Sequence, residues 1–221
     1  MKKISVAALL SFNGGFVDTA GFLGLQGLFT AHITGNFVTL ASTLVQGTHG
    51  VIAKLIALPE FVIIVALTRM LGTAMTRREL PALRLLLSAK VLFLIVFFVL
   101  AVALGPFPDS DGPAALVTGF AGVGGMAIQN AAQRVHYASI PPTTLMTGNT
   151  TQAVIDAVDI MSGAAASTST NILERFGRTI RSVIWFAVGC ALSAALYYLF
   201  GFWCLAVSVV VGAATAIVGE K

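Results

Sequence analysis

The stretch Leu85–Gly105, LLLSAKVLFLIVFFVLAVALG, is apolar apart from Ser88 and Lys90. A helix needs about 20 predominantly apolar residues to cross the hydrocarbon core of a bilayer. The chain contains further stretches of this kind, and Val183–Val218 is long enough for two crossings. The sequence therefore predicts an all-α, polytopic membrane protein.

Composition supports this fold class. Hydrophobic residues make up 57% of the chain and charged residues 10%, whereas soluble domains carry roughly 25% charged residues. The 22 glycines suit helices in lipid, where small residues let backbones approach closely. The net charge of +4 comes from residues at helix ends and not from one basic face, so we expect no nucleic-acid partner. We predict a single membrane domain, residues 1–221, whose partner is the lipid bilayer.

Hydropathy predicts about six transmembrane helices. They are Ile4–Phe29, Val51–Met75, Leu85–Gly105, Ala114–Ala132, Ser182–Phe200 and Phe202–Val218. Pro59 and Glu60 interrupt the second span, either as a kink or because Gly35–Gln46 and Val51–Met75 form two membrane segments. The basic start followed by Ile4–Phe12 resembles a signal peptide, but no cleavage site follows promptly, so we expect an uncleaved first helix.

The loop charges predict the orientation, because Lys and Arg in short loops stay in the cytoplasm. A cytoplasmic N-terminus places ten basic residues inside: Lys2, Lys3, Arg77, Arg78, Arg84, Arg134, Arg175, Arg178, Arg181 and Lys221. Arg69 and Lys90 then fall at the cytoplasmic boundary, and only Lys54 lies outside. The loop Pro106–Pro113 contains Asp109 and Asp111 and no basic residue, as an outer loop should. Both termini are therefore predicted to be cytoplasmic.

The tripeptide Thr34-Gly35-Asn36 recurs as Thr147-Gly148-Asn149. Each copy follows a glycine pair by about 20 residues and precedes a short helix-like run and two spans. Three spans per repeat is an odd number, so the second copy must be inverted relative to the first. We predict two inverted three-helix repeats, residues 1–105 and 114–221, each with a Thr-Gly-Asn turn. In transporters such repeats meet at a binding site near the bilayer midplane.

The chemistry of the tripeptide suits a binding site. Thr is a good N-cap, Gly permits a close approach of backbone or ligand, and Asn offers both a donor and an acceptor. Free N–H groups at the start of the next helix favour an anion or a polar ligand. The alternative is a capped re-entrant turn without a ligand, because irregular backbone at membrane depth needs polar partners in any case. The sequence does not decide whether these segments enter the bilayer.

Asp18 lies midway along the first predicted span, and an ionisable group there is costly and a functional candidate. The equivalent region of the second half contains Gln129 and Asn130. These three residues form a candidate proton- or cation-coupled site. The alternative is that Asp18 joins helices, with its carboxyl protonated or paired to Arg134 or a Thr hydroxyl.

Histidine titrates near physiological pH, and His32 and His136 lie near the two turns, where they could serve a proton path or only complete hydrogen bonds. His49 is assigned to a loop. The candidate substrate-binding or pathway residues are Asp18, His32, Thr34, Gly35, Asn36, Gln129, Asn130, Thr147, Gly148 and Asn149.

Asp156 and Asp159 are three residues apart and so share a helix face. We expect them to form a solvated ion-pair network at the cytoplasmic end of the bundle with Arg134, Arg175 or Arg178; a substrate site is the alternative. The stretch Ser162–Asn171 is rich in small and polar residues and is predicted to be a linker.

Several of these stretches resemble the YoaK family of bacterial inner-membrane proteins, which is grouped as domain of unknown function 1275. They are Gly15–Phe22 (GFVDTAGF), Phe29–Asn36 (FTAHITGN), Gln129-Asn130-Ala131 and Thr143–Gly148 (TTLMTG). The resemblance covers nearly the whole chain. It implies a six-helix protein of the bacterial inner membrane and supplies no substrate.

The leading functional hypothesis is a transporter or channel-like permease for a small polar solute or ion that the sequence does not identify. A non-transporting membrane scaffold or sensor is the alternative, and an intramembrane enzyme is a third. No catalytic motif occurs, so we expect no enzyme and no cofactor. Cys190 and Cys204 form no metal-ligand pattern, and no metal is expected. The oligomeric state, including a homo-oligomer, stays open.

Overall fold

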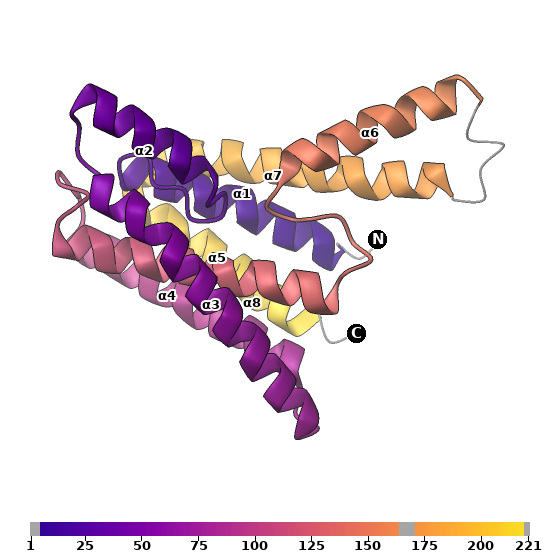
Figure 1. The fold of residues 1–221 in the computed structure, drawn as a ribbon, viewed down its shortest axis with the longest axis horizontal. Helices are drawn as coiled ribbons and strands as arrows, with labels where there is room; N and C mark the ends of the chain where they lie inside the picture. Colours follow the sequence, from indigo (N-terminus) through magenta and orange to yellow (C-terminus); the bar gives the residue numbers. More distant parts are fainter. Residues whose placement is uncertain (1–4, 164–170, 219–221) are drawn as a thin grey trace.

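The computed structural model describes residues 5–163 and 171–218, which form helices and connecting segments without any strand. Figure 1 shows the order along the chain. The elements are α1 (Val6–Gly24), α2 (Gly35–Gln46), α3 (Val51–Arg77), α4 (Ala82–Leu104), α5 (Pro113–His136), α6 (Met146–Met161), α7 (Ile172–Phe200), the 3₁₀ turn η2 (Gly201–Cys204) and α8 (Leu205–Val218). The predicted all-α class is confirmed.

Four of the described helical stretches are long and apolar enough to cross a membrane. They are α1, α3, α4 and the stretch Ile172–Val218, which contains α7, η2 and α8. These stretches are consistent with the membrane protein that the hydropathy predicts. Helix α5, which covers the predicted span Ala114–Ala132, is not among them, so the number of crossings stays a prediction.

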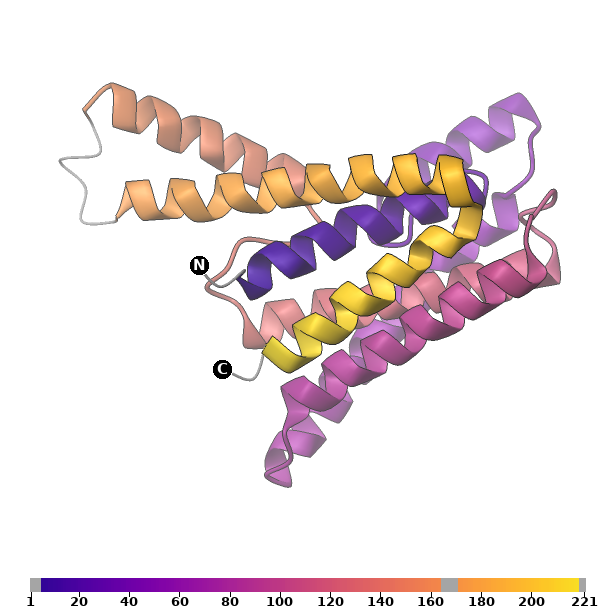
Figure 2. The ribbon, with the colours of Figure 1, turned by 180° about the vertical axis from the view of Figure 1, so that it is seen from behind.

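Helix α1 is central in the bundle. It packs against α5, α7 and α8, and α4 packs against α5 and α8. Figure 2 shows α7, α1, α8 and α4 side by side. Helices α1 and α7 approach closely at Gly15 and Gly189, where an added Cβ would overlap the backbone of the other helix. The Ser193 hydroxyl of α7 also donates a hydrogen bond of 2.8 Å to the carbonyl of Phe16. Small residues and interhelical hydrogen bonds of this kind hold helices together in lipid.

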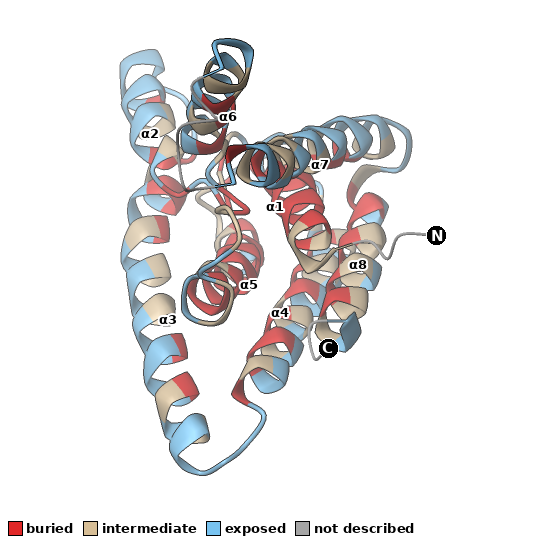
Figure 3. Cartoon of the chain, turned by 90° about the vertical axis from the view of Figure 1, so that its right-hand side faces the viewer, coloured by how far each residue is buried: buried red, intermediate tan, exposed pale blue. Residues whose placement is uncertain are grey.

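The distribution of burial distinguishes the helices. Buried residues cover most of α1 and much of α5, whereas α3 carries a long exposed face (Figure 3). The exposed side chains of α3 include Leu55, Val62, Ile63 and Leu67. An apolar exposed face is what a helix bordering lipid requires. The described ends of the chain lie at the same end of the bundle (Figure 1).

The first predicted span, Ile4–Phe29, is too long. Helix α1 ends at Gly24, and residues 25–34 are not helical. Gln26 and Gly27 adopt positive φ angles of 50° and 84°, which a right-handed helix does not permit. Apolarity continues beyond this break, and hydropathy alone could not locate it.

The second predicted span, Val51–Met75, corresponds to α3 (Val51–Arg77). Helix α3 runs through Pro59 without ending, and α2 is a separate short helix. Helix α7 begins at Ile172, about ten residues before the predicted Ser182, and α8 begins only after the 3₁₀ turn η2. Most of the predicted linker Ser162–Asn171 lies outside the described residues.

Lys90, which the topology argument places at the cytoplasmic boundary, faces the inside of the bundle. Its side chain is fully buried. When the side-chain amide of Asn13 on α1 is turned by 180°, which gives both of its polar atoms a partner, its oxygen lies 3.1 Å from the Lys90 ammonium. In this orientation the Asn13 amide nitrogen also donates to the carbonyl of Ser208 on α8. The lysine therefore belongs to the interface of α1, α4 and α8.

Candidate functional site

Two non-helical segments enter the bundle, residues 25–34 before α2 and residues 137–145 before α6. Each connects a buried helix, α1 or α5, to a short helix. Outside a helix the backbone N–H and C=O groups need other partners, and inside a bundle water does not supply them. Buried polar side chains supply them here.

Asp18 holds the first segment. One of its carboxylate oxygens accepts hydrogen bonds from the backbone N–H groups of Ala31 (2.7 Å) and His32 (3.3 Å). The hydroxyl of Thr30 lies 3.5 Å from the same oxygen. The expected pairing with a Thr hydroxyl is therefore present at long range, but the main partners of Asp18 are backbone donors.

Asn36, in the first turn of α2, closes the same segment. Its side-chain amide donates to the carbonyl of Phe29 at 2.8 Å and accepts from the N–H of Phe29 at 2.8 Å. Asn36 is 2% exposed. The amide therefore replaces both backbone bonds that Phe29 would make in a helix.

Gln129 and Asn130 hold the second segment. The Gln129 amide donates to the carbonyl of Leu10 on α1 (3.0 Å) and to the hydroxyl of Thr143 (3.3 Å). Asn130 accepts a bond of 2.6 Å from the hydroxyl of Thr144. These two α5 residues contact the second segment through the side-chain hydroxyls of Thr143 and Thr144, whereas Asp18 binds the backbone of the first.

Asn149, in the first turn of α6, donates to the carbonyl of Pro142 at 2.6 Å. The sequence separation is seven residues, as between Asn36 and Phe29. The reciprocal bond exists only in the first half, because proline has no N–H. The two Thr-Gly-Asn copies thus use their asparagines in the same way.

Both segments lie against α1 at glycines. A Cβ atom on Gly14 would lie 2.8 Å from the carbonyl oxygen of Thr143, and one on Gly21 would lie 2.7 Å from the methyl group of Thr30. Gly14 and Gly21 are about two helical turns apart on α1, so both segments pack against the same helix.

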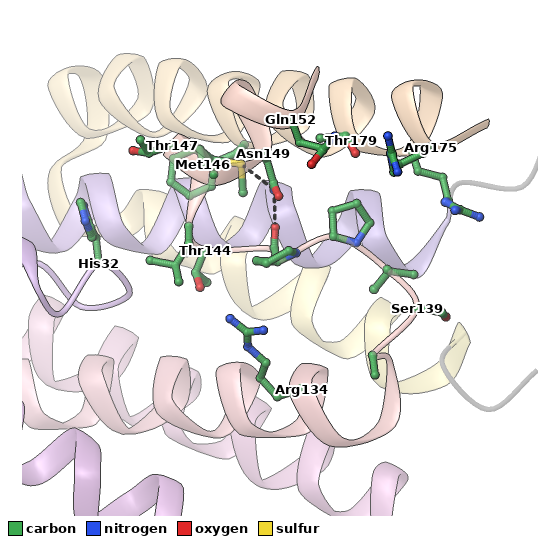
Figure 4. A pocket seen from close by; sticks show the side chains of 18 residues that line it. His32, Arg134, Ser139, Thr144, Met146, Thr147, Asn149, Gln152, Arg175 and Thr179 are labelled. Carbon is green, nitrogen blue, oxygen red and sulfur yellow. Dashed lines mark hydrogen bonds between the residues drawn. The ribbon is translucent and has the colours of Figure 1, made fainter. Parts of the chain in front are cut away.

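A cavity of about 860 Å³ extends from the first segment along the second. Figure 4 shows His32 at one end, Arg175 at the other, and Arg134 extending from α5 toward the segment before α6. The polar side chains that line it are His32, Arg134, Ser139, Thr144, Thr147, Asn149, Gln152, Arg175, Arg178 and Thr179.

The predicted site residues divide into two groups. His32, Thr147, Gly148 and Asn149 line the cavity. Six do not: Asp18, Thr34, Gly35, Asn36, Gln129 and Asn130. Thr34 occupies the expected N-cap position of α2, but its side chain makes no capping bond. Thr147 lies inside α6, whose N-cap is Leu145.

The predicted ion pair at the cavity rim is confirmed for Asp156. Arg175 donates to both of its carboxylate oxygens, with a shortest distance of 2.7 Å. The hydrogen bond from Arg175 lowers the pKa of the Asp156 carboxyl below its usual value. Asp156 itself is fully buried, whereas the Arg175 side chain is 36% exposed, so the pair joins α6 to α7 and only its arginine meets solvent.

Thr144, Gln152 and Thr179 line the cavity and were missed. Thr179 follows Arg175 by four residues and precedes Phe186 by seven, so one face of α7 borders the cavity. That periodicity is readable in the sequence. The predicted span begins at Ser182 and therefore leaves Arg175 and Thr179 outside the helix.

The described residues contain no group of three or more His, Cys, Asp or Glu side chains that could hold a metal ion. Comparison with known proteins gives one family match: residues 6–218 match the family described as a protein of unknown function (DUF1275). This confirms the resemblance to that family. No curated protein and no solved structure matches the chain.

Proposed function

We propose that this chain, which belongs to the DUF1275 family, is a permease for a small polar solute or ion, and that its path includes the cavity beside α6. The observation that carries the proposal is the convergence of two broken-helix segments on one helix and one cavity. In many transporters, interrupted helices at the interface of two repeats form the substrate site, and their termini point at the ligand. The cavity of about 860 Å³ has the size of an ordinary small-molecule site.

Inverted repeats are the second part of the proposal. The order helix, broken segment, short helix, helix, helix occurs in α1 to α4 and again in α5 to α8. The matching bonds of Asn36 and Asn149, each to a carbonyl seven residues earlier, support the equivalence. The six crossings then include α5. This helix can be less apolar than the others because neighbouring helices, and not lipid, surround it.

The proposed orientation places both termini in the cytoplasm of a bacterium, with the chain in the inner membrane. Arg134, Arg175 and Arg178 then mark the cytoplasmic end of the cavity. The opposite end of the bundle is tied by polar contacts: the Lys54 ammonium donates to the carbonyl of Gln26 (3.0 Å), and Asp111 accepts from the N–H groups at the start of α3. This arrangement supports a conformation open toward the cytoplasm.

The test uses Gly148→Trp. Nothing lies within 4 Å of a Cβ placed on Gly148, and this residue lines the cavity, so a large side chain there would fill the cavity without displacing backbone. Wild-type protein in liposomes should carry at least one of a set of small polar solutes and ions above the level of empty liposomes. Gly148→Trp should abolish that flux and leave the melting temperature unchanged.

Gly177→Trp is the matched control. Gly177 lies on α7 outside the cavity lining, and nothing lies within 4 Å of its Cβ position either. It should keep wild-type flux. Absence of flux through the wild type for the whole set, or equal flux in Gly148→Trp and wild type, would refute the proposal.

The second candidate is a non-transporting membrane scaffold or sensor. It is favoured by one observation: Asp18, Asn36, Gln129 and Asn130 are all engaged in bonds that hold backbone or neighbouring side chains. A scaffold predicts that substitutions of these residues lower stability and that Gly148→Trp has no effect on any measurable activity. We assign no enzymatic reaction.

A further inference from the structure

The charges around the cavity have one sign. Among its lining residues Arg134, Arg175 and Arg178 are cationic, and none is Asp or Glu. A cationic solute would therefore meet repulsion without a carboxylate to receive it. An anion would meet guanidinium groups, which bind carboxylate and phosphate oxygens in a fixed geometry.

The three arginines differ in how far they are already neutralised. Arg175 is paired with the buried carboxylate of Asp156, and Arg178 lies 2.9 Å from Glu174. Arg134 has no carboxylate partner among the described residues. It extends from the end of α5 toward the segment before α6 (Figure 4). Its charge is therefore available to a ligand.

Neutral donors complete the site. Thr147 and Thr179, which carry hydroxyl groups, line the cavity, and Gly148 brings the backbone of the first turn of α6 to it. No side chain caps the amino-terminus of this helix, so its first N–H groups need a partner. An anion satisfies such groups and is favoured by the helix dipole.

We infer that the cavity binds a small oxyanion, such as a carboxylate, sulfate or phosphate, with Arg134 as its principal charged contact and the first turn of α6 as its neutral contact. The inference rests on the proposed permease function, because only a permease would make the oxyanion a substrate. Binding itself can be measured without transport. The same oxygens could come from a lipid headgroup, since the arginines lie at one end of the bundle, and the experiment separates the two sources.

The experiment measures binding of potassium phosphate, sulfate and succinate to purified protein in phosphatidylcholine nanodiscs by titration calorimetry at constant ionic strength. Choline and mannitol serve as cationic and neutral comparators. At least one oxyanion should bind and the comparators should not. Arg134→Gln should weaken binding about tenfold or more, which corresponds to about 1.4 kcal/mol, and Arg134→Lys should weaken it less.

Arg77→Gln is the matched control, since it removes an arginine from the end of α3, outside this cavity. It should bind like the wild type. The inference is overturned by absence of oxyanion binding, by binding of choline, or by equal losses in Arg134→Gln and Arg77→Gln. Melting temperatures of all variants show whether a loss of binding comes from misfolding. If Arg134→Gln is misfolded, oxyanion binding by the more conservative variant Arg134→Lys is the test.

Nanodiscs containing phosphatidylglycerol distinguish the source of the oxyanion. If free oxyanions do not bind and only phosphatidylglycerol raises the melting temperature, in an Arg134-dependent manner, the small-solute inference fails in favour of a headgroup. If oxyanions bind as expected but do not cross liposomes, the permease proposal fails and the binding site stands. If a cation or neutral solute crosses and no oxyanion binds, the permease stands and this inference fails.

Discussion

Two substitutions of Asp18 test whether this residue anchors the segment before α2 through hydrogen bonds or serves as a titrating group. Asp18→Ala removes the acceptor of the Ala31 and His32 N–H groups, which lie 2.7 and 3.3 Å from the carboxylate. A buried donor left unpaired costs about 1–3 kcal/mol. The N–H of Ala31 bears most of this cost, because Ala31 is 4% exposed and its bond is the shorter. We therefore expect the free energy of unfolding to fall by about 2–4 kcal/mol.

Asp18→Asn is expected to behave differently. An amide oxygen can still accept both N–H groups, and only the charge assistance is lost, so the expected fall is about 1–2 kcal/mol. The assay is thermal unfolding in detergent, with Asn36→Ala as a control that removes the other anchor of the same segment. The anchoring role would be refuted if Asp18→Ala were as stable as wild type. It would also be refuted if the two Asp18 variants were equally destabilised.

Three further predictions follow from single contacts. The Asp156 pKa is lowered by Arg175, so the stabilisation is complete above the ordinary Asp pKa near 4 and is lost as pH falls through the lowered value. The melting temperature should therefore drop below about pH 4, and Arg175→Gln should remove this dependence. Lys90→Met should melt at or above the wild-type temperature, because an apolar residue of similar length avoids burying an ammonium; a large fall would contradict this. Gly189→Ala should lower the free energy of unfolding by about 1–3 kcal/mol, because the added methyl group would overlap a carbonyl of α1. Gly177→Ala has open space at its Cβ and should be at least as stable as wild type in the same melting assay.

Hydropathy located the long helices because their property is summed over about 20 residues. Helix α4 is within three residues of its predicted start at Leu85 and within one of its predicted end. The break after Gly24 could not be found this way, because residues 25–34 are nearly as apolar as α1. It depends on two positive φ angles and on a carboxylate seven or more residues away, which are tertiary facts.

The site was predicted in part for the same reason. The second copy of the tripeptide, Thr147-Gly148-Asn149, lines the cavity, and the two asparagines make the same kind of bond to a carbonyl seven residues earlier. From the sequence, Arg134 is a topology marker, since a basic residue at a helix end satisfies the positive-inside rule, and a candidate ion-pair partner of Asp18, Asp156 or Asp159, but not a ligand-binding residue. Nothing in the sequence distinguishes an arginine facing the headgroups from one that extends into a cavity.

The most conspicuous polar residues of a membrane sequence need not be those that meet a ligand. A broken helix in a bundle exposes N–H and C=O groups that lipid cannot satisfy, and the nearest buried polar side chains are used to satisfy them. Asp18 and Asn36 satisfy backbone groups of the first break and Asn149 one of the second, where Gln129 and Asn130 bind threonine hydroxyls. What remains for a ligand is the set of donors that the fold leaves incompletely paired, namely Arg134 and the uncapped start of α6. The buried polar residues therefore hold the shape of the cavity, and its rim sets the charge that the cavity accepts.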